Sequence, residues 1–290
     1  MNLLNRTSIP YRKITVPCCN VCNTGYLSQI ERSVRKVLQK GFLDTSENLL
    51  LMAQWLSKIL IGILIKETGL LLDRSDPEKG PIVPPAYIEE LRHCHYVMQS
   101  ARKPMFFNCL HWDFPFSLFT YQILDDGRSG SFDLMTNIPG QSIAMRIGQL
   151  GIVFVNDGGL QMEIGPRGPF SLSGTSISGF QFSEIAARVH YKASLRDATH
   201  IYLTGENEQS VDIVQLQVSS YSGYLPDGQR LQIFRDWNEV ELSHMLSGYM
   251  HLDRSLIFDD ETGTCKTTLV DQNGRPLRDP NVSGSPIVEN

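Results

Sequence analysis

Three cysteines lie within five residues near the start of the 290-residue sequence, at Cys18, Cys19 and Cys22. Cys19 and Cys22 have the two-residue spacing that lets a tight turn present two thiolates to one tetrahedral zinc ion. The pair is half of such a site. The same spacing occurs in redox pairs beside a βαβ unit, but no strand and helix pattern of that kind flanks it. Zinc ligation is therefore the leading interpretation, with a redox pair and unliganded cysteines as alternatives.

The residues after the cysteine pair resemble the second zinc knuckle of bacterial HNH endonuclease-like proteins. In those proteins a Cys-x-x-Cys-Asn-Asn segment is followed by an aromatic or bulky residue, by Ser and Glu, and by a helix. The matching residues are Cys19, Cys22, Asn23, Leu27, Ser28 and Glu31, and Thr24 replaces the second asparagine. The resemblance extends through the segment Trp55-Leu-Ser-Lys58 and weakly into residues 146–159.

This resemblance implies a ββα-metal nuclease. In that family, cysteine pairs hold a structural zinc, a divalent metal such as Mg²⁺ stabilises the phosphate and the leaving oxygen, and a histidine acts as general base on water. By resemblance, Cys19 and Cys22 are zinc ligands. Asn23, Ser28 and Glu31 are then motif residues that position the knuckle and the helix behind it.

The chain departs from the family pattern ahead of the knuckle. The family's first cysteine pair and its Glu-His or Asp-His stretch precede this point, yet residues 1–17 contain no Cys, His, Asp or Glu, and the first histidine is His93. Asn23 stands where many members place a metal-binding residue, but an amide cannot activate water. The catalytic residues are therefore unknown. Three explanations stay open: Met1 is an internal methionine of a longer reading frame, a partner chain supplies the missing half-site, or the module has degenerated.

The N-terminal end of the chain is basic, although the whole chain has a net charge of −5. Residues 1–40 contain seven Lys and Arg against the single acid Glu31. A helix directly behind the knuckle carries four of these cations on its polar face: Arg32, Arg35, Lys36 and Lys40. Lys and Arg supply contacts to phosphates, so the stripe predicts a nucleic-acid partner, with DNA as the expectation. A solvated charged face is the alternative.

The other cysteines and the most apolar segment indicate a reducing, cytoplasmic compartment and no membrane span. Cys94, Cys109 and Cys265 are scattered, whereas a disulfide framework needs regular spacing in a short secreted chain. Charges interrupt the apolar segment 49–72, and its longest uninterrupted apolar run is the seven residues 59–65, between Lys58 and Lys66. A membrane span needs about twenty apolar residues, so the segment predicts a buried central helix.

Hydrophobic periodicity predicts helices first and strands afterwards. Helices are expected from Thr24 or Ser28 to about Lys40, over 46–72 and over 85–102, and later over 181–195 and 237–250. Strand candidates are 105–109, 116–124, 132–137, 142–147, 152–156, 200–204 and 211–219. This order predicts an α+β protein with a mostly antiparallel sheet and added helices. The expected division is a partial HNH zinc-knuckle module (1–45), a helical region (46–102), an α+β domain (103–271) and a disordered tail (272–290).

Two further clusters of metal-binding residue types are interpreted as packing. His93, Cys94 and His95 point in different directions on a helix, so they cannot all face one metal. Cys109, His111 and Asp113 share one face of a strand, but neighbours two residues apart seldom form a Cys-His nucleophile pair.

Two acidic positions are interpreted as surface features. The segment Asn156-Asp-Gly-Gly159 predicts a turn with Asp157 at a solvated corner. Glu184 and Arg188 have i,i+4 spacing, which predicts an exposed helix pair worth a few tenths of a kcal/mol.

Two functions of different classes follow from these observations. The first is an HNH endonuclease-like protein that binds nucleic acid or hydrolyses phosphodiesters with a metal, and whose catalytic set is incomplete. The second is a non-catalytic interaction protein, in which the body from Lys103 onward binds a protein or small ligand and the knuckle is degenerate. Zinc content and the salt dependence of DNA binding separate the two.

Overall fold

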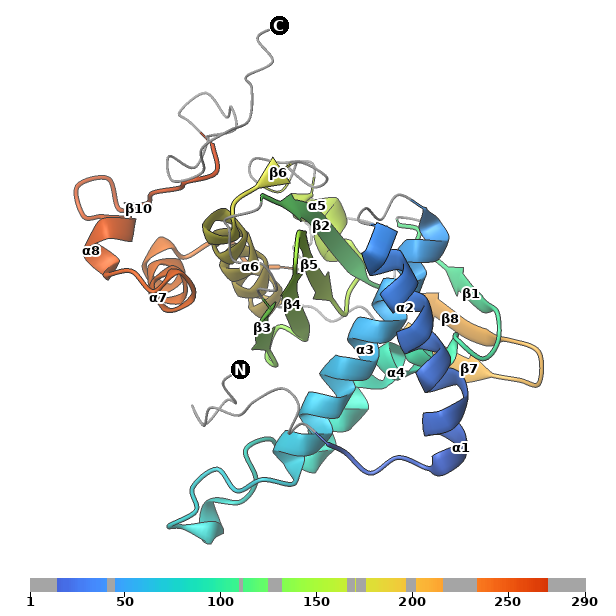
Figure 1. Ribbon diagram of the computed structural model, residues 1–290. Coiled ribbons are helices and arrows are strands. Elements are labelled where there is room, and N and C mark those ends of the chain that lie inside the picture. The colour runs from blue at the N-terminus through green and yellow to red at the C-terminus, as the bar shows by residue number, and fades with distance from the viewer. Residues whose placement is uncertain are drawn as a thin grey trace, which may run out of the picture.

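A computed structural model describes residues 15–40, 45–109, 112–124, 132–165, 170, 176–196, 202–215 and 234–270. Helices come first in the chain and mostly antiparallel strands follow, with further helices after them (Figure 1). The α+β prediction is therefore confirmed. The predicted tail over 272–290 lies outside the described residues.

The chain enters its first long helix through a kinked turn. α1 (Asn20–Cys22) runs into the π-turn η2 (Asn23–Leu27), in which Gly25 has a non-helical φ of −85° and ψ of −119°. The Ser28 hydroxyl closes this turn by donating to the carbonyl oxygens of Thr24 at 2.8 Å and Gly25 at 3.0 Å. α2 (Ser28–Lys40) then follows, with its predicted bounds, and buries Ile30 and Val34.

α3 (Ser46–Thr68) is the central helix, as its nearly all-round apolar sequence predicts. The Thr45 hydroxyl caps its start by accepting the amide of Asn48 at 3.2 Å. The helix ends at Thr68, short of the predicted end, because the Gly69 amide bonds to the Lys66 carbonyl and Leu71 pairs with Pro81. Its length and composition would allow it to cross a membrane, but in this structure α3 packs between α2, α4 (Arg92–Gln99) and strand β4 (Ser142–Ile147) as a core helix does.

The third predicted helix consists of two helical segments. η4 (Pro85–Leu91) is a 3₁₀ helix with proline at its first position, and α4 (Arg92–Gln99) continues it. The α-helix ends at Gln99, three residues before the predicted end, and beyond it the amides of Ala101 and Arg102 form only turn bonds to the carbonyls of Met98 and Gln99. Another 3₁₀ turn, η3 (Pro77–Lys79), lies in the connector after α3.

A five-stranded sheet forms the middle layer, in the order β3-β4-β5-β2-β6. Its strands are β2 (Ser117–Ile123), β3 (Phe132–Asn137), β4 (Ser142–Ile147), β5 (Leu150–Val155) and β6 (Ser176–Ile177). Neighbouring strands from β3 to β2 are antiparallel, while the short β6 is parallel to β2. Gly148 supplies the positive φ of 57° in the tight turn between β4 and β5.

Helices cover both faces of this sheet (Figure 1). Ile143 and Phe154 face the core that α2, α3 and α4 share, whereas Ala144 and Val153 face α6 (Gly179–Ser194). The alternation follows from the two-residue repeat of a strand. A capping box of Ser178 and Gln181 fixes the start of α6.

Smaller elements complete the fold. A three-stranded sheet in the order β1-β8-β7 contains β1 (Met105–Asn108), β7 (Tyr202–Glu206) and β8 (Val211–Gln215), with β1 parallel to β8. After it come α7 (Glu239–Met250), α8 (Arg254–Ile257) and the hairpin of β9 (Phe258–Asp259) and β10 (Thr264–Cys265). The elements that lie outside the predicted helices and strands are α1, η3, α5 (Gly159–Ile164), β6, α8, β9 and β10.

Candidate nucleic-acid interface and cysteine knuckle

The cysteine pair lies in one tight turn at the start of α1. The backbone amide of Cys22 donates to the Cys19 sulfur at 3.2 Å, and the amide of Asn23 donates to the Cys19 carbonyl at 3.0 Å. Cys18 and Cys19 are exposed and Cys22 is half-buried. The hydrogen bond between the two thiols lowers the pKa of Cys19 and raises the pKa of Cys22. The turn therefore makes Cys19 the more acidic thiol of the pair.

The two thiols do not complete a zinc site with other described residues. No group of three His, Cys, Asp or Glu side chains suited to a metal occurs within the part of the chain that the structure describes. Cys18 does not make a third ligand with its neighbours. Two thiolates fit half of a tetrahedral zinc site, so zinc ligation by Cys19 and Cys22 stays a prediction that requires two more donors.

The histidines of α4 have partners other than the knuckle sulfurs, and the Nε2 of His95 lies 3.0 Å from the side-chain nitrogen of Gln99. The Nε2 of His93 lies 2.8 Å from the Asn156 carbonyl, and its ring stacks on Tyr202 at 4.6 Å. Burial raises the pKa of Cys94 to about 12 and lowers the pKa of His95. The side chains of His93, Cys94 and His95 therefore have different surroundings and do not face one metal, as the helical geometry predicts.

The knuckle is attached to the end of α4 through Tyr26. The Gln99 amide donates to the Tyr26 hydroxyl at 3.1 Å, and the Arg102 guanidinium lies over the Tyr26 ring at 5.5 Å. Arg102 also donates to the Gln99 side chain at 3.1 Å. Sequence reasoning missed these two partners, which lie more than seventy residues away. The motif match assigned the bulky position to Leu27, so nothing in it pointed to the contacts of Tyr26.

Two motif residues hold the helix behind the knuckle. Ser28 closes the kinked turn, as described above, and Glu31 forms an ion pair with Lys58 of α3. Lys58 belongs to the second segment in which the resemblance was seen. Asn23 is exposed, and its side chain makes no hydrogen bond within the described residues.

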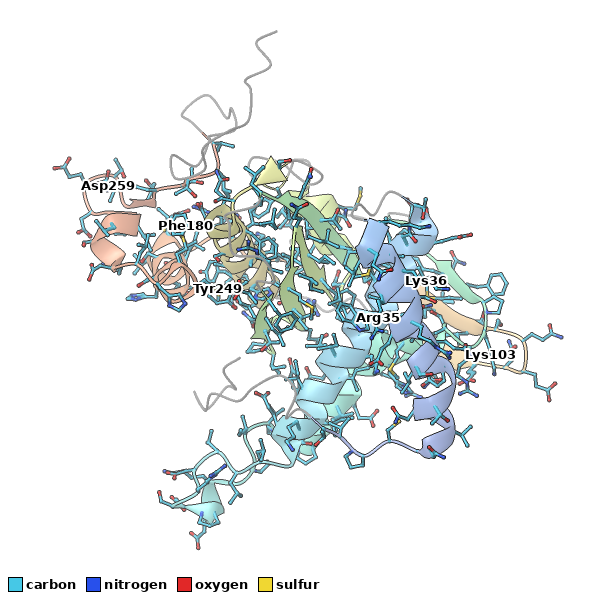
Figure 2. All side chains as sticks on the ribbon, in the orientation of Figure 1. Arg35, Lys36, Lys103, Phe180, Tyr249 and Asp259 are labelled. Carbon is cyan, nitrogen blue, oxygen red and sulfur yellow. The ribbon has the colours of Figure 1, made fainter. Side chains whose placement is uncertain are left out.

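The predicted basic residues form an exposed stripe on α2, which we call the basic stripe: Arg32, Arg35, Lys36 and Lys40. Figure 2 shows Arg35 and Lys36 on the outer side of this helix. Arg32 donates to the Ser28 carbonyl at 3.3 Å. Within the described residues, Arg35, Lys36 and Lys40 form no ion pair. The stripe is about 12 Å long, since a helix rises about 1.5 Å per residue.

No family matches. Comparison of the chain with protein-family models, curated proteins and solved structures found nothing similar. The HNH resemblance therefore rests on the motif residues alone and stays a prediction.

Asp157 is not at a solvated corner, contrary to the prediction. Its side chain is 1% exposed, lies 3.6 Å from the Arg196 guanidinium, and accepts the amide of Gly159 at 2.7 Å. The turn is buried because Gly158 lies directly against the Phe114 carbonyl and the Trp112 ring, where a Cβ would clash.

Glu184 is not a surface residue either, although the predicted pair with Arg188 forms at 2.8 Å. The carboxylate is 1% exposed and accepts from the hydroxyls of Thr267 and Thr268, both at 2.6 Å, and from the Thr268 amide at 2.8 Å. It therefore anchors the segment after β10 to α6.

Cys109 directly follows strand β1, and its thiol donates to the side-chain oxygen of Gln215 at 2.7 Å. His111 lies outside the described residues. The interpretation of this cluster as packing stays a prediction.

His190 and Lys192 are buried in the interior, which the sequence did not indicate. The Nδ1 of His190 lies 2.7 Å from the hydroxyl of Tyr249 on α7, a residue labelled in Figure 2, and desolvation lowers the pKa of His190 to about 3. Lys192 pairs with Glu163 at 2.9 Å and donates to the Arg235 carbonyl at 2.7 Å. These two residues join α6 to its neighbours and do not extend the knuckle site.

Proposed function

We propose that the chain is an HNH endonuclease-like protein that binds nucleic acid, with DNA as the expected ligand, through the basic stripe of α2. The observation that carries this proposal is the set of four exposed cations, Arg32, Arg35, Lys36 and Lys40, on one helix directly behind the knuckle. The acid of the same helix, Glu31, is engaged by Lys58 of α3 and so does not neutralise the stripe.

The attachment of α2 supports the proposal because it fixes the direction in which the stripe faces. Ile30 and Val34 are buried against α3, and the turn before α2 is held by Ser28 and Tyr26. A duplex carries one phosphate charge per about 1.7 Å of its axis, so a stripe of about 12 Å spans several phosphates. Because the four cations lie on a helix that is already folded, binding to a phosphate backbone has no additional cost for ordering that helix.

Hydrolysis is not part of the proposal. The family mechanism needs a histidine as general base beside the divalent metal, and His93 is engaged with Asn156 and Tyr202 instead. The catalytic residues stay unassigned, and Mg²⁺ stays an expectation from the resemblance.

Charge-neutralising substitutions in the basic stripe test this proposal. The triple variant Arg32→Gln, Arg35→Gln, Lys36→Gln removes three exposed cations without disturbing the buried face of α2. We expect its affinity for a labelled DNA duplex, measured by fluorescence anisotropy at about 50 mM salt, to fall on the order of tenfold or more. The matched control is Arg74→Gln, Arg92→Gln, Lys266→Gln, which removes three exposed cations elsewhere. Equal losses in both variants would contradict a role specific to α2.

A second candidate function is an interaction protein, and one observation favours it. Phe106, Leu203 and Val214 lie on one face of the β1-β8-β7 sheet and are 62%, 53% and 36% exposed. Exposed apolar groups that lie together on a sheet face are typical of protein contacts. A folded chain that binds neither zinc nor DNA would favour this reading.

A further inference from the structure

The knuckle is a preformed half of a four-thiolate site. One turn holds the Cys19 sulfur against the Cys22 amide at 3.2 Å, so both thiols are in place before a metal arrives. Such an amide bond to sulfur also stabilises a thiolate, which is the form that binds zinc. Within the described residues no further set of donors joins them, and residues 1–17 contain no Cys, His, Asp or Glu. Among the described residues, the half-site therefore lacks two of the four ligands of a tetrahedral zinc.

The same turn is open to another molecule. Cys18 and Cys19 are exposed, and Val21, which lies between the two ligands, is 82% exposed. Figure 1 shows α1 at the margin of the molecule, at the end of the helical layer. Val21 is the most exposed of the large apolar residues in the described structure, so nothing covers the turn in the single chain.

We propose that a second copy of this chain covers the knuckle and completes one zinc site, with each copy contributing Cys19 and Cys22. Two identical pairs related by a twofold axis give the tetrahedral arrangement of four sulfurs at about 2.3 Å from zinc. Each thiol loses its proton on binding, so Zn²⁺ and four thiols give a Zn(Cys)₄ centre of charge −2 and four protons. The inference rests on the zinc-knuckle reading of the proposed function.

Nearby groups suit such a centre. Arg102 lies over Tyr26 beside the knuckle in each copy, so two guanidinium groups offset the charge of the centre. The axis that relates the two copies also brings the two Val21 side chains toward each other. The dimer would carry two basic stripes, which doubles the cations available to one nucleic acid.

Zinc stoichiometry and molar mass test the inference with the full chain. We expect the zinc-free protein to be a monomer of 32.7 kDa by light scattering and to double its mass as zinc is added, with saturation at one zinc per two chains. A chelator should reverse the change. Cobalt in place of zinc should give the strong thiolate charge-transfer and visible bands of a tetrahedral sulfur site. One zinc per monomeric chain, or no zinc binding, would overturn the inference.

Single substitutions identify the ligands. We expect Cys19→Ser and Cys22→Ser each to remain monomeric at every zinc concentration, while the control Cys18→Ser dimerises like the unaltered chain. Loss of dimerisation in all three variants would overturn the proposed ligand set. The stripe variant separates this inference from the proposed function: it should lose DNA affinity and keep the zinc-dependent dimer, whereas Cys19→Ser should keep DNA binding as a monomer.

Discussion

Individual side chains in this protein differ in chemistry according to where the fold places them. A hydrogen bond lowers the pKa of the exposed Cys19, whereas burial raises the pKa of Cys94 to about 12. Because zinc binds thiolates, the buried Cys94 is a poor ligand at neutral pH, whereas Cys19 lies exposed in the turn beside Cys22. Residue type alone makes the two equivalent, and only their surroundings separate them.

His190 makes the stability of the protein depend on pH. The pKa of His190 is about 3 in its fully buried site and 6.5 in its unperturbed state. Between these two pH values the unfolded chain therefore binds a proton at His190, whereas the folded chain keeps this histidine neutral. The contribution of His190 is therefore fully present above pH 6.5 and is lost as the pH falls toward 3, at about 1.4 kcal/mol per pH unit. We expect the unaltered chain to lose about 2 kcal/mol more than His190→Gln between pH 7 and pH 5 in urea denaturation.

The control for this prediction is an exposed histidine. His244 lies on the solvent side of α7, so His244→Gln should leave the pH dependence of the unaltered chain in place. If His190→Gln and the unaltered chain lose stability equally over this pH range, His190 is not held neutral by burial.

At the scale of elements, two ion pairs connect neighbouring segments and differ in their energetic weight. The Glu31 side chain is 56% exposed, so its pair with Lys58 is worth about 0.2–1 kcal/mol and mainly sets how α2 lies on α3. Glu184 is 1% exposed and accepts four hydrogen bonds from α6 and the segment after β10. The buried carboxylate is therefore the group whose loss should release the C-terminal elements.

Glu184→Gln tests the weight of that buried carboxylate. The amide keeps the shape of the side chain but turns a donor toward groups that themselves donate, so we expect a loss of about 2–4 kcal/mol in the free energy of unfolding. The exposed Glu261→Gln should change stability by less than about 0.5 kcal/mol. Urea denaturation followed by circular dichroism measures both, and equal midpoints for the two variants would show that Glu184 anchors nothing.

For the whole molecule, the sequence predicted elements with long and regular patterns and missed the short ones. Phe132–Asn137 and Ser142–Ile147 have their predicted bounds because turn residues limit both strands. β6 and β9 are two residues long and exist because neighbouring segments lie against them, which no local pattern records. The end of α3 depended on a bond from Gly69 to Lys66 and on pairing of Leu71 with Pro81, which periodicity also does not show.

The candidate site was predictable where its residues are close in sequence. The knuckle turn, the Ser28 bonds and the basic stripe all lie within residues 19–40. The contacts of Tyr26 with Gln99 and Arg102, and the burial of His190, depend on how distant helices pack. Asp157 was assigned to a solvated corner because its turn sequence is typical of surface loops, whereas the neighbouring Gly158 packs against Phe114 and Trp112 and the turn is buried.

The salt dependence of DNA binding tests the central claim most directly. For the monomeric Cys19→Ser chain, the logarithm of the association constant should fall linearly with the logarithm of salt concentration. We expect a slope of about −3.6 if all four cations of the basic stripe contact phosphates, and a slope near −1 after the triple stripe substitution. A slope that is the same with and without the stripe, or no binding at low salt, would contradict the account.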